Sequence, residues 1–510
     1  MRRTTHLLLL AVTVMLVVAA VLIDLDRVPM PWWDEGWTMA VARNWVERGH
    51  YGQLLNDQPA QVGLTAAFPT VASVALSFRL FGVGVAQARL VLVGYTLIAL
   101  VLLYWLARRL YDRRVAIAAL IVVMVAADPN VQPLFLGRQV LAEMPMMVYL
   151  LIGYVAFDQA LRRSGWWLLI ASGAWGVGLI AKQQALPFWV MSLLVPIGWV
   201  VLKRQWQIAW RLTLSLIGGY AVMRLLPIGL AALIGQPIAS PTLEGLVDVT
   251  AVVLIPEVRL TLLVFVAQLG LPTLIGLIYS LQRLWQTTEV AAPRSTLHWM
   301  IWSLAASWFA WYVLLSRGSP RYVFPPVFIG SVFVAALLSD LTHGFHRHSM
   351  VATRFNRRSV GALLMIVLLL VMAVFNLRWL GEVLTEARLG DAPVQATAAF
   401  LNTQTPPGAL IETYNSELFV LLRRPYHFPP DQTNVALIRD VTRANFGAAV
   451  ELSADDERWL EYDPLSASPD YLVVGAANEL WRRLYDPILK TAAFKRVYAN
   501  RVYEVYERQR

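Results

Sequence analysis

Long apolar runs constrain this chain more than any other feature of its sequence. Segments such as 258–282 and 359–377 hold few or no charged side chains over about twenty residues, the length that a helix needs to cross a bilayer. Only 15% of the 510 residues are charged, whereas a soluble protein carries roughly a quarter. The pattern predicts a mainly α-helical, polytopic membrane protein.

The apolar runs predict about eleven spans. They lie near 7–23, 85–107, 115–131, 141–160, 165–181, 186–202, 207–234, 258–282, 297–315, 322–342 and 359–377. Counting a further stretch, 62–78, as a span would put all the basic loops on the outer side. The positive-inside rule therefore predicts that 62–78 is a membrane-embedded or interfacial piece interrupted by Pro69, with the N-terminus in the cytoplasm and the C-terminus outside.

The first run follows two arginines, as in a signal peptide. The polar residues after it show no convincing small-x-small cleavage site, which favours an uncleaved anchor. In either case Asp34 and Glu35 emerge beyond the membrane. The net charge of +10 comes from basic residues in short loops. It therefore indicates the membrane topology of the chain and not a nucleic-acid-binding surface. Without cysteine, disulfides and thiolate metal sites are excluded.

The pattern changes after about residue 380. "GALIETYNSELFVLL", "DYLVVG" and "FKRVYANRVYEVYER" predict short strands, and "DDERWLEY" and "ANELWRRLYDPILK" predict polar helices between them. We expect a transmembrane module over 1–380, with a first external loop at about 24–84, and a C-terminal external α/β domain over 381–510.

Acids and bases from separate segments converge on the predicted outer face. They are Asp34 and Glu35 in the first loop, Asp128, Arg138 and Glu143 in the second, Lys182 and Gln183 after the fifth span, and Arg317, Arg321 and Tyr322 before the tenth. Ionisable groups near hydrocarbon are costly, so their concentration at outer span ends favours a functional site. The loop around Asp248 and Glu257 is a further candidate wall of the groove.

Each of these residues also has a structural interpretation. Asp34 fits the cap of an amphipathic helix, with Glu35 in its first turn. Arg138 and Glu143 fit an ion pair at a loop-to-helix corner. Lys182 and Arg321 fit cations that snorkel from span ends, and the neighbouring tryptophans fit interfacial anchors.

Four motifs resemble those of the GT-C glycosyltransferases, in order and over about residues 1–380. They are "WWDEGWTMAVARNWVERGHYG", "GRQVLAEMP", "GLIAKQQALP" and "SPRYVFPPV". They are most similar to the branch of dolichyl-phosphate-mannose protein mannosyltransferases and bacterial aminoarabinose transferases. Glu143 stands where many relatives have Asp, and the chain lacks the "WWDYG"-like signature of oligosaccharyltransferases, which argues against transfer of a whole glycan to asparagine.

The resemblance implies an enzyme that takes a sugar from a polyprenyl phosphate in the cell membrane and passes it to a lipid, glycan or protein hydroxyl. Arg138, Lys182 and Arg321 are the cations available to bind the donor phosphate, and Asp34 is the candidate general base. Direct displacement implies inversion at the anomeric carbon. Tyr322, Gln183 and Asp128 are candidate groove residues.

Glu35 and Glu143 are further candidate catalytic residues. They would hold the acceptor, tune Asp34 or bind a divalent cation such as Mg²⁺ or Mn²⁺, for which Asp34 and Glu143 are the candidate ligands. Two other classes of function stay open. A lipid-linked glycan transporter would place ionisable groups at the bilayer midplane, and an envelope-assembly scaffold would tolerate loss of Asp34. Within the enzymes, a lipid-linked oligosaccharide ligase or polymerase is also open.

Overall fold

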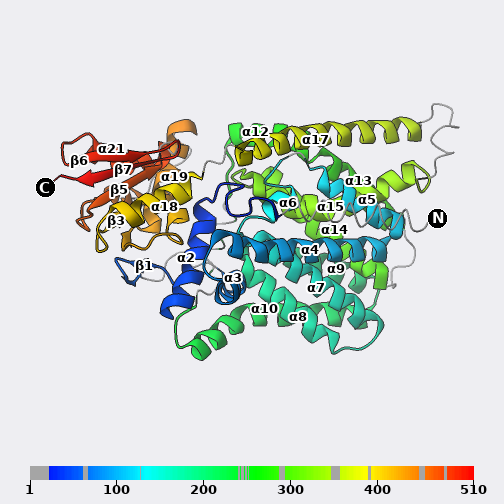
Figure 1. Ribbon diagram of the computed structural model, residues 1–510. Helices are drawn as coiled ribbons and strands as arrows, with labels where there is room; N and C mark the ends of the chain where they lie inside the picture. The colour runs from blue at the N-terminus through cyan, green and yellow to red at the C-terminus, as the bar shows by residue number, and fades with distance from the viewer. Residues whose placement is uncertain are drawn as a thin grey trace, which may run out of the picture.

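A helical body and a smaller domain with a five-stranded sheet make up the molecule (Figure 1). The computed structural model describes residues 22–60, 67–126, 128–238, 252–286, 293–345, 357–388, 392–446, 454–475 and 479–509, together with 242, 246 and 250. The predicted first span, 7–23, falls almost wholly outside the described residues, and so does Asp248.

The helical body follows the predicted apolar runs. Its helices are α2 (Trp33–Arg48), α3 (Phe68–Phe81), α4 (Val85–Leu110), α5 (Arg113–Met124), α6 (Pro133–Leu136), α7 (Glu143–Arg162), α8 (Trp167–Ala181), α9 (Leu186–Leu202), α10 (Trp206–Ile234), α12 (Pro256–Leu269), α13 (Leu271–Gln286), α14 (Pro293–Leu314), α15 (Phe324–Leu341) and α17 (Arg357–Arg388). Short 3₁₀ turns η1 (Gln183–Ala185) and η2 (Pro320–Val323) precede α9 and α15. Strands β1 (Leu54–Leu55) and β2 (Gln58–Pro59) form a hairpin after α2.

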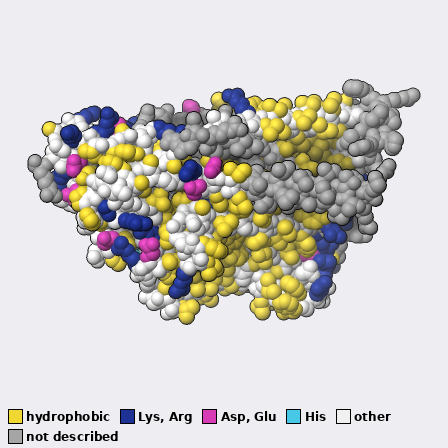
Figure 2. Space-filling model, in the orientation of Figure 1, with side chains coloured by type: hydrophobic (Ala, Val, Ile, Leu, Met, Phe, Trp, Pro, Cys, Tyr) yellow, Lys and Arg dark blue, Asp and Glu magenta, His cyan; other side chains and the backbone are white. Residues whose placement is uncertain are grey.

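Apolar side chains hold the body together and also cover its outside. α7 packs on α8, α8 on α10, and α13 and α5 on α15, and residues 324–338 of α15 are all buried. By contrast, α10 and α17 expose large apolar side chains such as Trp210, Leu233 and Leu364. Hydrophobic side chains cover much of the body in Figure 2. A soluble monomer rarely exposes so much contiguous apolar surface, so this face suits lipid.

Six of the described helices are long and apolar enough to cross a membrane, or seven if α12 and α13 are one bent span. Those two helices meet at 79°, beside Gly270 and Pro272, in the run expected to be a single span, 258–282. The multi-pass membrane fold is thus supported, whereas the total of about eleven spans and the orientation of the termini stay predictions.

The stretch 62–78 contains α3, which begins at Phe68 and has a proline in its first turn. Pro69 therefore starts this helix and does not interrupt it, because the first turn needs no N–H from that residue. With 14 residues, α3 is about 21 Å long at 1.5 Å per residue, which is too short to cross a bilayer alone. Its exposed Leu76, Leu80 and Phe81 suit the interfacial placement that we expect.

The C-terminal domain is an α/β unit with a mixed sheet. Its strands are β3 (Ile411–Glu412), β4 (Tyr426–His427), β5 (Tyr471–Gly475), β6 (Phe494–Ala499) and β7 (Tyr503–Arg508), in the order β4-β3-β5-β7-β6. β3 runs parallel to β4 and β5, and β7 runs antiparallel to β5 and β6. Helices α18 (Pro393–Gln404), α19 (Asp431–Phe446), α20 (Ala454–Leu460) and α21 (Glu479–Leu489) and the 3₁₀ turn η3 (Ser416–Leu418) complete it.

Two features link the domain to the body. α17 continues to Arg388, so the boundary expected after residue 380 falls inside this helix. The core of the C-terminal domain also includes Trp37 and Ala40 of α2, whereas Met39, Val41 and Ala42 of the same helix pack with α3 and α4. α2 therefore belongs to both cores.

Close packing of α7 on α8 gives a first test. A Cβ added at Gly153 would lie 2.4 Å from the ring of the fully buried Trp175. We expect Gly153→Ala to lower the free energy of unfolding by about 1–3 kcal/mol, because the ring has no space to move into. Thermal unfolding in nanodiscs measures this, with Gly173→Ala in α8, where a Cβ meets open space, as the control. Equal midpoints for the two variants would contradict the packing.

Candidate functional site

The first turn of α2 sends its two acids in different directions. Trp32 is the N-cap residue and makes no side-chain cap bond, so Asp34 lies inside the first turn and is not the cap. Asp34 pairs with Arg321, whereas Glu35 is fully buried against Arg89. Neighbouring residues of a helix do not face each other, which agrees with the divergence expected from sequence. Both carboxylates still benefit from the positive end of the helix dipole.

Asp34 is one member of a linked cluster of two acids and two cations. Arg321 forms an ion pair with Asp34, and its Nε lies 3.9 Å from Oε1 of Glu143. The same Glu143 oxygen accepts a hydrogen bond from Lys182 at 2.5 Å. Acids and cations alternate along these contacts, so each partly buried charge has a partner of opposite sign. We call these four residues the acid–cation cluster.

Helix ends bring the members of the cluster together. Glu143 is the first residue of α7, and Lys182 is the C-cap residue of α8. Each charge opposes the partial charge of its helix end, which is favourable. Arg321 lies in η2, directly before α15. Four sequence-separated segments thus meet at one end of the helical body.

Aromatic rings form the walls around Arg321. The guanidinium carbon lies 5.0 Å from the ring centroid of Trp32, whose indole N–H donates to Oε1 of Gln139. Tyr322 is buried, and its ring lies within 6 Å of Lys182, Arg317 and Arg321. Cation–π contacts of this kind hold cations in place without neutralising them. Arg317 also donates to the Tyr322 hydroxyl at 2.8 Å.

Glu35 sits in a buried network behind the cluster. Both of its oxygens accept from Arg89, at 2.9 and 2.7 Å, and one also accepts from the backbone N–H of Val140. Arg89 donates in addition to the Leu25 carbonyl. Bidentate pairing with added hydrogen bonds is what a buried ion pair requires. The geometry therefore favours an anchoring role for Glu35 over contact with substrate.

The other predicted residues lie in loops or at helix ends. Arg138 is buried and donates to the Ile23 carbonyl. Burial lowers the pKa of Arg138 to about 10, helped by the positive charge of Arg89, so it stays charged at neutral pH. Asp128 accepts from the backbone N–H of Asn130, and burial raises its pKa. Gln183 begins η1 beside Lys182. Glu257 is exposed in the first turn of α12.

Sequence reasoning missed Arg89, although the signal was present. Arg89 stands four residues into the apolar run that becomes α4, and a charge inside a span calls for a named partner. The missed contacts of the C-terminal domain had no comparable signal, because they join residues more than 370 positions apart, such as Trp33 and Ser416.

The C-terminal domain reaches α2 through η3. The Ser416 hydroxyl donates to the Trp33 carbonyl at 2.5 Å, and Glu417 lies buried between α2 and β7, where it accepts from the Tyr503 hydroxyl at 2.6 Å. Burial raises the pKa of Glu417 to about 7, and the negative charge of Glu35 adds to this. A carboxyl from the C-terminal domain is therefore held next to the Glu35–Arg89 pair.

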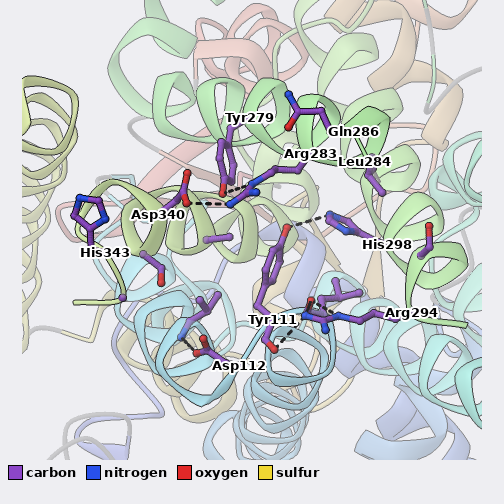
Figure 3. Close-up of a pocket in the computed structure, with 16 residues that line it drawn as sticks. Tyr111, Asp112, Tyr279, Arg283, Leu284, Gln286, Arg294, His298, Asp340 and His343 are labelled. Atoms are coloured by element: carbon purple, nitrogen blue, oxygen red, sulfur yellow. Dashed lines mark hydrogen bonds and ion pairs between the residues drawn. The ribbon is translucent and has the colours of Figure 1, made fainter. Parts of the chain in front are cut away.

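A separate cavity of about 660 Å³ lies at the other end of the helical body. Its wall includes Tyr111, Asp112, Tyr279, Arg283, Arg294, His298, Asp340 and His343. In Figure 3, Tyr111 points to His298, and Arg283 points to Tyr279 and Asp340. None of the predicted site residues lines this cavity, so it is distinct from the acid–cation cluster.

The described residues contain no group of three or more His, Asp or Glu side chains placed to hold a metal ion. The two predicted ligands, Asp34 and Glu143, each contact a cationic side chain. These ion pairs engage one oxygen of each carboxylate, Oδ2 of Asp34 and Oε1 of Glu143.

Comparisons with known proteins agree with this architecture. A family model described as dolichyl-phosphate-mannose-protein mannosyltransferase matches residues 69–229, which include Glu143 and Lys182 but not Asp34 or Arg321. No protein among those with curated descriptions matches the chain.

Solved structures match over nearly the whole chain. ArnT from Cupriavidus metallidurans bound to undecaprenyl phosphate is 17% identical, with a TM-score of 0.63 and 98% of each chain covered. The Archaeoglobus fulgidus oligosaccharyltransferase tethered with an acceptor peptide is 12% identical, with a TM-score of 0.51 over 98% of this chain and 74% of that one. At these identities the matches show the fold alone, and the expected fold, shared with ArnT and this oligosaccharyltransferase, is confirmed.

The Glu35–Arg89 pair gives a direct test of the buried network. Glu35→Gln or Arg89→Met alone leaves one buried charge without its partner, which costs about 3–5 kcal/mol. We expect each single variant to lower the thermal midpoint in nanodiscs strongly and the double variant to recover much of the loss. A double variant as unstable as the sum of the two single variants would show that the pair is not coupled.

The raised pKa of Glu417 predicts that the stability of the folded protein depends on pH. Its pKa in the folded protein, about 7, lies above the usual 4.5. Between these values the folded state keeps a proton that the unfolded state has lost, so the free energy of unfolding falls as the pH rises, by at most about 1.4 kcal/mol per pH unit. Denaturation between pH 5 and about 8 measures the slope, and Glu417→Gln is expected to reduce it. An identical slope in the variant would assign it to other groups.

Proposed function

We propose that the chain is an inverting glycosyltransferase that moves a sugar from a polyprenyl phosphate to an acceptor hydroxyl at the outer face of the membrane. The observation that carries this proposal is the acid–cation cluster, which places two cations and two carboxylates at one end of an apolar helical body. The lipid tail of the donor suits the exposed apolar helices, and its phosphate suits the cations. The similarity to ArnT bound to undecaprenyl phosphate supports the same donor class.

Arg321 is suited to receive the donor phosphate. Its Nε is buried and has no hydrogen-bond partner among the described residues, although Glu143 lies 3.9 Å away. Lys182 approaches the same Glu143 oxygen from α8. A planar guanidinium and a mobile ammonium together stabilise the charge that develops on a phosphate as it leaves the anomeric carbon. Arg138 donates to the Ile23 carbonyl and is not one of the four residues of the acid–cation cluster, so we do not assign it to the donor phosphate.

Asp34 is suited to act as the general base, and donor binding frees it. Without donor, Arg321 neutralises Asp34. A donor phosphate competes for the same guanidinium, so that Asp34 is released to accept the proton of the acceptor hydroxyl. The hydroxyl oxygen then bonds to the anomeric carbon from the face opposite the phosphate, the bond to the phosphate oxygen breaks, and the configuration inverts.

This mechanism predicts different effects at the two kinds of residue. Asp34→Asn is expected to lower the rate of sugar transfer by about 10²- to 10⁴-fold. Lys182→Met and Arg321→Lys are expected to raise the KM for the donor, because they weaken phosphate binding. Release of labelled sugar from a panel of polyprenyl-phosphate sugars, with crude envelope acceptors, measures both.

Arg283→Lys is the matched control, because this arginine lines the separate cavity. Turnover of one donor by the wild type that survives undiminished in Asp34→Asn would remove Asp34 as the base. Retention of the sugar configuration in the product would contradict direct displacement.

The cluster also predicts the response to chelators. The carboxylates that are candidate metal ligands already contact Arg321 and Lys182, which supply positive charge where a metal would. We therefore expect transfer to persist, within about twofold, after treatment with EDTA. Loss of transfer on chelation, with recovery on addition of Mg²⁺ or Mn²⁺, would contradict this expectation and show that the working enzyme needs a divalent cation.

A further inference from the structure

The turn of α2 that carries Asp34 is held from the side of the C-terminal domain. Ser416 in η3 donates to the Trp33 carbonyl, one residue before Asp34. Trp33 stacks on Tyr414, with the ring centroids 5.4 Å apart, and on Trp37 at 5.2 Å. These contacts join the backbone and side chains next to Asp34 to the loop that follows β3.

Gly36 makes the closest approach between α2 and η3. A Cβ at this position would lie 2.2 Å from the backbone nitrogen of Glu417 and 2.3 Å from its Cα, closer than real Cβ contacts occur. Both opposing atoms belong to the backbone, so they cannot turn aside as a side chain does. Glycine inside a helix costs about 1 kcal/mol relative to alanine, and here the close backbone approach explains its presence.

Contacts further along α2 fix its direction. The Arg43 guanidinium donates to the carbonyls of Phe419, Val420 and Leu422, at 3.1, 3.2 and 2.6 Å. Trp37 meets the ring of Phe428 edge-on at 5.3 Å. The C-terminal domain thus contacts α2 over three turns, from Trp33 to Arg43, and sets both the position and the axis of the helix.

Glu417 joins the contact between η3 and α2 to the sheet of the C-terminal domain. Its carboxyl accepts from the Tyr503 hydroxyl of β7 at 2.6 Å, and its backbone lies against Gly36. The side chain is buried. A shift of η3 would therefore move α2 relative to Arg321, Glu143 and Lys182.

We propose that η3 of the C-terminal domain is a positioning element of the active site, with Gly36, Ser416 and Glu417 as positioning residues that set where the Asp34 carboxylate lies. The inference rests on the proposed function, in which Asp34 is the base. Arg321, Glu143 and Lys182 come from the helical body, so a shift of α2 moves the base relative to the donor site. A displacement of about 1 Å can cost about 10²-fold in rate.

Gly36→Ala tests the proposal, with Gly94→Ala in α4, where a Cβ meets nothing within 4 Å, as the matched control. We expect Gly36→Ala to lower kcat by about 10- to 100-fold while the KM for the donor changes by less than about threefold, because its cations stay in place. Gly94→Ala is expected to keep both values. A variant that is merely unstable would instead give less active enzyme, with the kcat per active molecule and the first turn of α2 unchanged.

Glu417 supplies the second pair of variants. Glu417→Gln keeps the size and the oxygen that accepts from Tyr503, so we expect it to retain at least about half of kcat. Glu417→Ala removes the contact with β7 and is expected to lower kcat with little change in donor KM, as in Gly36→Ala. Equal losses in the glutamine and alanine variants would overturn the positioning role of this side chain.

Amide hydrogen exchange of α2 in the full-length protein gives a readout that needs no substrate. Loss of protection at 33–40 in Gly36→Ala, with Gly94→Ala unchanged, is the expected result. Unchanged protection together with wild-type kcat overturns the proposal. If the wild type transfers no sugar while the Gly36→Ala variant still loses amide protection at 33–40, the proposed function is contradicted. The contact between η3 and α2 is then still supported.

Discussion

The pairing of the Arg321 guanidinium with the carboxylates of Asp34 and Glu143 is the interaction on which this end of the helical body depends. Charges next to hydrocarbon are tolerated only when they are paired, and here one cation joins α2 to α7 while Lys182 joins α7 to α8. The same pairing makes the site responsive, because an anionic ligand that competes for Arg321 changes the partners of two acids at once.

α2 connects the acid–cation cluster to the rest of the fold. One of its faces belongs to the core of the C-terminal domain and another to the core formed with α3 and α4. Glu35 fastens the helix to α4 through Arg89, and Gly36 lets η3 approach its backbone. The candidate base therefore sits on a helix that is fixed from two sides, which is the pre-organisation that catalysis by a positioned group requires.

The sequence predicts the parts of this structure that depend on local pattern. Apolar runs become helices because a bilayer leaves a backbone few other ways to satisfy its hydrogen bonds, and span ends predict where Asp34, Glu143, Lys182 and Arg321 gather. The 79° bend between α12 and α13 was not predicted, because the hydropathy of the run 258–282 is continuous across it. Arg89, the partner of Glu35, is marked by its place in an apolar run, although the run does not say which acid it pairs with. Glu417, which lies against Gly36, is far away in sequence and no local pattern identifies it.

The proposed function requires the acid–cation cluster to receive the phosphate of a lipid-borne sugar donor. The most direct measurement is a cryo-EM structure of the protein in nanodiscs with a polyprenyl phosphate. We expect phosphate density within hydrogen-bond distance of Arg321 and Lys182, with Asp34 released from Arg321. Phosphate density elsewhere, for example in the cavity lined by Arg283 and Arg294, with the Asp34–Arg321 pair intact, would contradict it.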